Sequence, residues 1–116
     1  MPTATTPRPR ERLVQSVILH YLALRRAMVV RTNSGGMKVD DRFVRFNSAK
    51  GCSDLLVCYR GRWVSLEVKR DAKAKATTTQ LEFLADVARA GGVGAVVWDI
   101  DGVAAILDAI DTEIDG

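Results

Sequence analysis

Residues 51–69 read GCSDLLVCYRGRWVSLEVK, and this stretch predicts a β-hairpin at the centre of the fold. Its two halves are rich in apolar and β-branched residues, as strands are, and Arg60-Gly61 between them has the X-Gly form of a two-residue hairpin turn. Three charged residues interrupt the apolar pattern: Asp54, Glu67 and Lys69. Because a buried charge is costly without a partner, a divalent metal ion is the expected partner of the two carboxylates.

The register of this hairpin determines whether the two acids meet. A two-residue turn at Arg60-Gly61 places Asp54 opposite Glu67, where cross-strand Cβ atoms lie roughly 4.5 to 5.5 Å apart. Side chains alternate between faces, so Lys69 lies on the same side as Glu67. A three-residue loop would instead set Asp54 opposite Val68, within diagonal reach of Glu67. The alternative interpretation is a surface salt bridge, since Glu-x-Lys is common on edge strands and contributes little stability.

Several separated motifs then resemble one family, the virus-type replication-repair nuclease (VRR-NUC) domain of the PD-(D/E)xK nuclease superfamily. The resemblance runs from about Glu11 to about Leu107. One departure is Ser53, where proline is common in the family. The motifs that carry the resemblance are Gly51-x-Ser53-Asp54-Leu55, Glu67-Val68-Lys69, Thr79-Gln80-x-x-Phe83-Leu84 and Gly91-Gly92-Val93.

The resemblance implies a role for each motif residue. Asp54 and Glu67 would bind Mg²⁺ or Mn²⁺, which prefer oxygen ligands, and the main-chain carbonyl near Val68 would add a further ligand. Lys69 would orient or activate the attacking water. Two auxiliary catalytic residues are implied by position, one on the first helix and one on the helix after the hairpin: Glu11 and Gln80.

Both auxiliary residues also have ordinary structural explanations. Glu11 is expected in the first turn of a helix, where a carboxylate is favourable because of the helix dipole. Gln80 follows Thr77 by three residues, which is the spacing of a capping box, and Thr79 with Glu82 offers the same spacing. A helix cap alone would account for Gln80, as the helix dipole alone would account for Glu11.

Periodicity predicts the remaining elements. The fold class is α/β, and the order αβββαβα with a mixed central sheet flanked by helices is that of the restriction-endonuclease-like PD-(D/E)xK core which the family resemblance implies. Trp63, Trp98 and Cys58 are expected to be packing residues. The predicted elements are helices over 9–27, 79–90 and 103–110, strands over 28–32, 55–59, 63–68 and 93–98 (the last buried on both faces), and an additional strand over 42–46 near the expected DNA path.

Composition predicts one domain in 116 residues, with a net charge of +3 and no apolar run of membrane-spanning length. We expect a flexible basic lead at 1–8, a nuclease domain at 9–110 and an acidic tail at 111–116. Two cysteines without a zinc or disulfide pattern indicate a reducing cytoplasm. Basic residues surround the proposed site, whereas acids gather toward the carboxyl end. Candidate phosphate contacts are Lys50, Arg70, Lys73 and Lys75, with Arg60 and Arg62 also expected beside the site.

These observations lead to one functional expectation and two alternatives. The expectation is a Mg²⁺- or Mn²⁺-dependent DNA endonuclease of phage or prophage origin. It would act as a homodimer on branched, junction or flap DNA in replication, recombination or repair, in the cytoplasm of a bacterial or phage-infected cell. The alternatives are a non-catalytic DNA-binding or assembly module with the same fold, and an RNA nuclease, because no residue indicates recognition of a 2′-hydroxyl.

Overall fold

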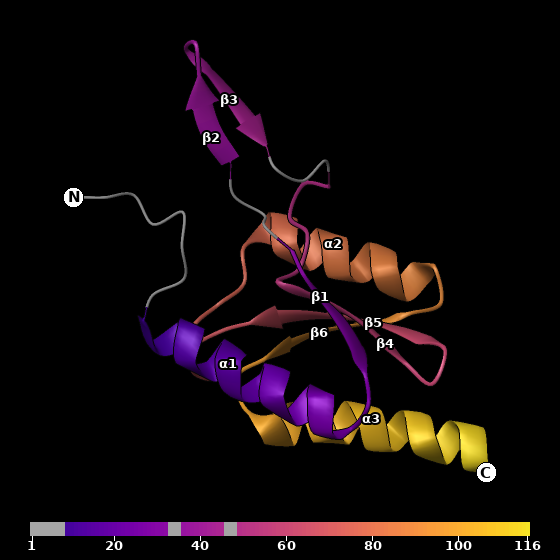
Figure 1. Ribbon diagram of the computed structural model, residues 1–116. Coiled ribbons are helices and arrows are strands. Elements are labelled where there is room, and N and C mark those ends of the chain that lie inside the picture. Colours follow the sequence, from indigo (N-terminus) through magenta and orange to yellow (C-terminus); the bar gives the residue numbers. More distant parts are fainter. Residues whose placement is uncertain (1–8, 33–35, 46–48) are drawn as a thin grey trace.

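A four-stranded sheet with helices on both faces forms the body of the computed structural model (Figure 1). The structure describes residues 9–32, 36–45 and 49–116, so the basic lead expected at 1–8 lies outside the described residues. The helices are α1 (Pro9–Leu24), α2 (Thr78–Arg89) and α3 (Ile100–Asp115). The strands are β1 (Met28–Arg31), β2 (Gly36–Val39), β3 (Arg42–Arg45), β4 (Leu55–Tyr59), β5 (Arg62–Val68) and β6 (Val93–Val97).

The strand order in the main sheet is β1-β4-β5-β6. The pairs β1–β4 and β4–β5 are antiparallel, whereas β5 and β6 are parallel and are joined through α2. Helix α2 covers one face of this sheet, and α1 and α3 lie together on the other (Figure 1). The predicted α/β class and the order αβββαβα are therefore confirmed for the elements of the main sheet.

A second, two-stranded sheet is formed by β2 and β3, which project from the body (Figure 1). The strand expected over 42–46 corresponds to β3, and its partner β2 was not predicted. The two strands are joined at Asp40 and Asp41, whose φ angles of 48° and 64° are typical of a tight hairpin turn. In the part of the chain that is described, β2 and β3 pair only with each other.

The apolar core lies on the α1 and α3 side of the main sheet. Along β5, alternate side chains point to this side, while Ser65 and Glu67 point to the α2 side and are buried there. The two faces therefore differ in chemistry, and the polar face is the one under α2. The core consists of Ile18, Leu22, Leu55, Val57, Tyr59, Val64, Leu66, Val68, Val97, Val103, Leu107 and Ile110.

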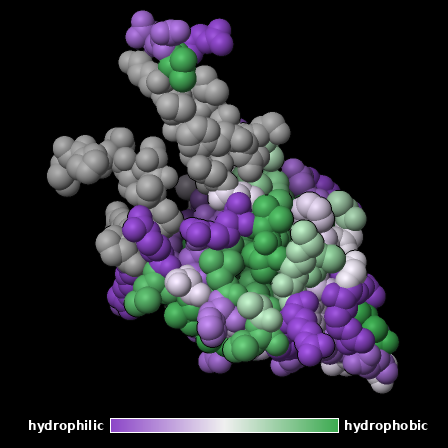
Figure 2. Space-filling model, viewed as in Figure 1, coloured by the Kyte–Doolittle hydropathy of each residue, from purple (hydrophilic) through white to green (hydrophobic). Residues whose placement is uncertain are grey.

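Two expectations about burial, those for the last strand and for Cys58, are wrong, and the cause is the position of each in the sheet. Strand β6 is an edge strand, so only Val97 of its residues is fully buried. Trp63 and Trp98 are 52 % and 41 % exposed. Cys58 is also exposed: it lies on the α2 side of β4, in the position paired with the partly exposed Trp63. In Figure 2 apolar residues gather over the edge where β1 lies, and part of this edge is likewise open to solvent.

None of the helices in the described ranges is both long enough and apolar enough to cross a membrane. The helices also differ in length from the prediction. Helix α1 ends at Leu24, and α3 extends from Ile100 to Asp115, beyond the predicted 103–110 at both ends. The acids at the carboxyl end of the chain are thus presented on a helix.

Candidate metal and catalytic site

The β4–β5 hairpin has the register that the sequence predicted. Arg60 and Gly61 have φ angles of 51° and 82°, as a two-residue turn with positive φ requires. Leu55 pairs with Leu66, so the next position outward sets Asp54 opposite Glu67. Because hydrogen-bonded and non-hydrogen-bonded pairs alternate, these two acids occupy a non-hydrogen-bonded position, where side chains approach most closely.

Asp54 is oriented by the strand beside it. Its Oδ2 accepts a hydrogen bond from the backbone N–H of Val68 at 2.8 Å. The N–H of Val68 points toward β4, but β4 begins at Leu55 and offers no backbone acceptor at this position. The carboxylate of Asp54 accepts the bond in its place. The end of the sheet therefore fixes the position of one carboxylate.

Glu67 is the most unusual group in the site. It is 2 % exposed, and its Oε1 is the one buried side-chain oxygen or nitrogen without a hydrogen-bond partner in the described residues. Burial raises the pKa of Glu67 well above its ordinary value, and the negative charge of Asp54 raises it further, while Lys69 acts in the opposite direction. A carboxylate in this position needs additional positive charge to remain ionised.

Lys69 supplies part of that charge. Its Nζ lies 3.5 Å from Glu67 Oε2 and 3.3 Å from Gln80 Oε1, and its side chain is 12 % exposed. The backbone N–H of Lys69 donates to the carbonyl of Val97 at 2.9 Å, which ties the residue to β6. The ammonium group is therefore held beside the buried acid.

Gln80 caps α2 and also contacts the site, and its part in catalysis stays a prediction. Its backbone N–H and side chain form a capping box with Thr77, the N-cap of α2, so the alternative box from Thr79 to Glu82 does not start the helix. The same side-chain amide donates to Glu67 Oε2 at 3.1 Å and accepts from Lys69. Gln80 thus connects the helix cap to the acid and the amine of the site.

A glycine allows the loop before Asp54 to approach α2. Gly51 has a φ of 72°, and a Cβ atom there would collide with the backbone of Thr79 in the first turn of the helix. Only glycine fits both conditions. This close approach brings the segment that carries Asp54 next to the helix that carries Gln80.

A divalent cation fits this donor set. The partnerless oxygen of Glu67 and the carboxylate of Asp54 are hard oxygen ligands, and Mg²⁺ typically takes one or two protein carboxylates with water completing its shell. The N–H and C=O of one strand residue point to the same side, so the carbonyl of Val68 also faces Asp54. The site has two acids, and no cluster of three or more histidine, cysteine or acidic residues that could hold a metal ion occurs within the described ranges. Water would therefore complete the shell of a cation held here.

Glu11 lies in the first turn of α1, on the line of residues that includes the buried Gln15, Ile18 and Leu22. Helix α1 begins at the end of the sheet where β5 ends (Figure 1). The backbone of Glu11 therefore lies at the same end of the sheet as Asp54 and Glu67, and the participation of Glu11 in catalysis stays a prediction.

The four candidate phosphate contacts lie on the two segments that border the site. Lys73 and Lys75 are exposed between the end of β5 and the start of α2, and Lys50 is exposed just before Gly51. Arg70 lies directly after Lys69 and pairs with Asp71 at 3.6 Å. Contact of these residues with nucleic acid stays a prediction.

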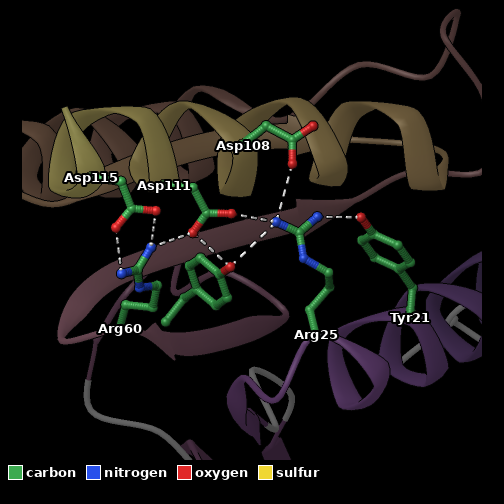
Figure 3. A network of polar contacts seen from close by, with 7 residues as sticks. Tyr21, Arg25, Arg60, Asp108, Asp111 and Asp115 are labelled. Carbon is green, nitrogen blue, oxygen red and sulfur yellow. Dashed lines mark hydrogen bonds and ion pairs between the residues drawn. The ribbon is translucent and has the colours of Figure 1, made fainter.

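Arg60 and Arg62 do not flank the site, contrary to expectation. They lie at the turn of the hairpin, the opposite end from Asp54. Arg60 pairs with Asp111 and Asp115 of α3 (Figure 3), and Arg62 pairs with Glu113 of the same helix. These arginines are near the other basic residues in the sequence, but the hairpin places its turn at the opposite end from the site. The acidic residues of α3 instead neutralise these arginines.

One residue that hydrogen-bonds the backbone at Asp54 was not predicted from the sequence. The backbone N–H of Thr32, just after β1, donates to the carbonyl of Asp54 at 3.0 Å, and its hydroxyl donates to the carbonyl of Ser53. A threonine at the end of a β-branched strand gives no distinct signal, because threonine is common in strands. Its partners become known only from the pairing of β1 with β4.

The fold is shared with a known structure described as "VRR_NUC domain". The two chains align with a TM-score of 0.63 and 22 % sequence identity, over 87 % of this chain and 97 % of the other. No protein-family model and no curated protein matches the sequence. The resemblance to the VRR-NUC domain that the motifs indicated is thus confirmed at the level of the fold.

Proposed function

We propose that this protein is a divalent-metal-dependent endonuclease that hydrolyses phosphodiester bonds in DNA. The observation that carries the proposal is the buried, partnerless Oε1 of Glu67, opposite Asp54 and beside Lys69. Two ionised acids in such an arrangement destabilise a protein unless a cation is bound, and two acids with a lysine at the end of a β-hairpin are suited to phosphodiester chemistry. The shared VRR_NUC fold supports the same conclusion.

Asp54, Glu67 and the carbonyl of Val68 would hold Mg²⁺ or Mn²⁺. When bound, the cation supplies Lewis acidity that offsets the charge of the scissile phosphate and makes water a better nucleophile. Lys69 has three N–H groups, of which Glu67 and Gln80 take two. The third would orient the attacking water or contact the phosphate. Gln80 keeps the amine in place, and Glu11 would assist from α1.

The DNA would approach over the segments that carry Lys50, Arg70, Lys73 and Lys75. These residues bind phosphates, and phosphate contacts carry no direct sequence information. We therefore infer selectivity for the shape of DNA, such as a branch, junction or flap, in phage replication, recombination or repair. A homodimer would present two sites to a symmetric junction. The two free cysteines are compatible with a reducing cytoplasm.

The test is cleavage of a labelled four-way junction and a matched linear duplex with Mg²⁺, Mn²⁺ or EDTA. We expect metal-dependent cleavage of the junction by the wild type, and loss of cleavage in Asp54→Asn and Lys69→Ala. Asp108→Asn, the same change on the exposed surface of α3, is the matched control and should cleave normally. Cleavage that survives Asp54→Asn would overturn the site assignment.

Two further results of this experiment would change the proposal. DNA binding in EDTA without any cleavage when metal is added would identify a binding or assembly module. Preferential cleavage of a matched RNA would make the protein an RNA nuclease. Sedimentation of the protein alone and with the junction tests the homodimer, because one protomer per junction is the result that contradicts it.

A further inference from the structure

Thr32 holds the backbone on both sides of Asp54. Its N–H donates to the carbonyl of Asp54 at 3.0 Å, and its hydroxyl donates to the carbonyl of Ser53, with the Asp54 carbonyl 3.3 Å from the same hydroxyl oxygen. These two carbonyls belong to the peptide groups that precede and follow the Cα atom of Asp54. Fixing both peptide planes fixes φ and ψ of Asp54 and therefore the direction of its side chain.

The hydroxyl is the part of Thr32 that goes beyond ordinary strand pairing. The bond from the Thr32 N–H extends the β1–β4 ladder by one position past Arg31 and Leu55. Any residue other than proline could make that bond. The bond to Ser53 needs a hydroxyl, which carries a single donor, and Ser53 is completely buried, so its carbonyl has little access to water.

Asp54 is consequently held from two strands. Thr32 fixes its backbone from β1, and the N–H of Val68 fixes its carboxylate from β5. We propose that the Thr32 hydroxyl is a positioning group that sets the Asp54 carboxylate for cation binding before the cation arrives. This inference rests on the proposed metal-dependent function and deepens it.

The experiment is a calorimetric titration with Mn²⁺ of the wild type, Thr32→Val and Thr32→Ser. Thr32→Val keeps the branched shape and the backbone N–H but lacks the hydroxyl. Groups that orient metal ligands typically contribute about 10- to 100-fold in affinity, so we expect Mn²⁺ binding to weaken by at least about tenfold in Thr32→Val. Thr32→Ser should bind nearly as the wild type does. Thr112→Val, on the exposed surface of α3, is the matched control.

Amide exchange of Val68 measured by NMR in EDTA gives a second readout that does not depend on metal. Looser placement of Asp54 should speed exchange of this N–H in Thr32→Val and leave it unchanged in Thr32→Ser. If Thr32→Val does not fold, the pair Thr32→Ala and Thr32→Ser isolates the hydroxyl in the same way.

The outcomes separate the two proposals. Equal Mn²⁺ affinity in the wild type and Thr32→Val would overturn the role of Thr32 and leave the proposed function standing. A wild type that binds no Mn²⁺ would overturn the proposed function, and the inference about Thr32 would fall with it. Weak binding in Thr32→Ser as well as Thr32→Val would also contradict a role for the hydroxyl.

Discussion

The two ends of the β4–β5 hairpin differ in how their charged residues are paired. At the open end, Glu67 is buried with a partnerless oxygen, and burial together with Asp54 raises its pKa. At the turn, Arg60 pairs with two acids of α3 at the surface, and its hydrogen bond lowers the pKa of Asp111. The first arrangement is costly without a ligand, whereas the second is complete within the chain.

The network at the turn joins three parts of the chain (Figure 3). Arg25, after α1, donates to the hydroxyls of Tyr21 and Tyr59 and lies over both rings. It also donates to Asp108 and Asp111 of α3. In Figure 2 hydrophilic residues gather over this carboxyl end of α3. Charges at the turn thus hold α3 to the hairpin and to the end of α1, whereas the acid at the open end has no full partner within the described residues.

The largest expected effect is the loss of cleavage on changing the open end. Asp54→Asn and Glu67→Gln should each reduce cleavage by at least about 100-fold, the scale seen when one group that stabilises a transition state is removed. Glu67→Gln should unfold in EDTA at a temperature at least as high as the wild type, because it removes a buried charge that has no full partner. A Glu67→Gln protein that is less stable and still active would contradict the account of the open end, because Glu67 would then stabilise the fold and not be needed for cleavage.

The next effect is on stability at the turn. Arg25→Leu removes bonds to two tyrosines and two aspartates, and charged hydrogen bonds of this kind contribute about 1 to 3 kcal/mol. Urea unfolding should show that loss, and the folded variant should cleave as the wild type does. Arg12→Leu, an exposed arginine on α1, is the control. A loss of cleavage in folded Arg25→Leu would show that the two ends are not separate.

A smaller effect distinguishes the two roles of Gln80. Thr77→Ala removes the cap of α2 and should lower stability by about 1 kcal/mol with cleavage near that of the wild type. Gln80→Met keeps the bond from its backbone N–H to Thr77 but removes the side-chain half of the capping box and the contacts with Glu67 and Lys69, and should also reduce cleavage by about tenfold. Equal cleavage by the two variants would show that Gln80 acts only through the helix cap.

The smallest effect is an opposite pH dependence at the two ends. The pKa of Asp111 is lowered by Arg60 and Tyr59, so its contribution is present above an ordinary pKa of about 3.9 and is lost as the pH falls through the lowered value. The pKa of Glu67 is raised, so protonated Glu67 contributes to the stability of the folded protein at low pH. That contribution declines as the pH rises above about 4.3 toward the raised value.

Urea unfolding in EDTA from roughly pH 3 to pH 8 would separate these contributions, because this range includes the ordinary pKa values of both acids. Glu67→Gln should lose less stability than the wild type as the pH rises. Asp111→Asn should lose less as the pH falls. The same pH profile in all three proteins would contradict the pKa directions assigned to the two ends.

The hairpin and its site were predictable because their signals are local. A two-residue turn with glycine and the alternation of side chains set the register, and the register alone brings Asp54 opposite Glu67. The capping box of Gln80 is equally local. The motif resemblance added the order of the elements, which the shared VRR_NUC fold confirms.

The features that sequence reasoning missed depend on contacts distant in the chain. The exposure of Trp63 and Cys58 follows from how much of the sheet α2 covers, and the pairing of Arg60 follows from where α3 ends. Thr32 reaches Asp54 only because β1 pairs with β4. No periodicity in the sequence specifies these arrangements.

The most direct measurement is thermal unfolding with Mn²⁺ or with EDTA, because a ligand that binds the folded state raises its melting temperature. The wild type and Asp111→Asn should both be stabilised by Mn²⁺, since each keeps the open end intact. Asp54→Asn and Glu67→Gln should show no stabilisation. If Mn²⁺ failed to stabilise the wild type, or stabilised Glu67→Gln equally, the buried acid would not be a cation ligand.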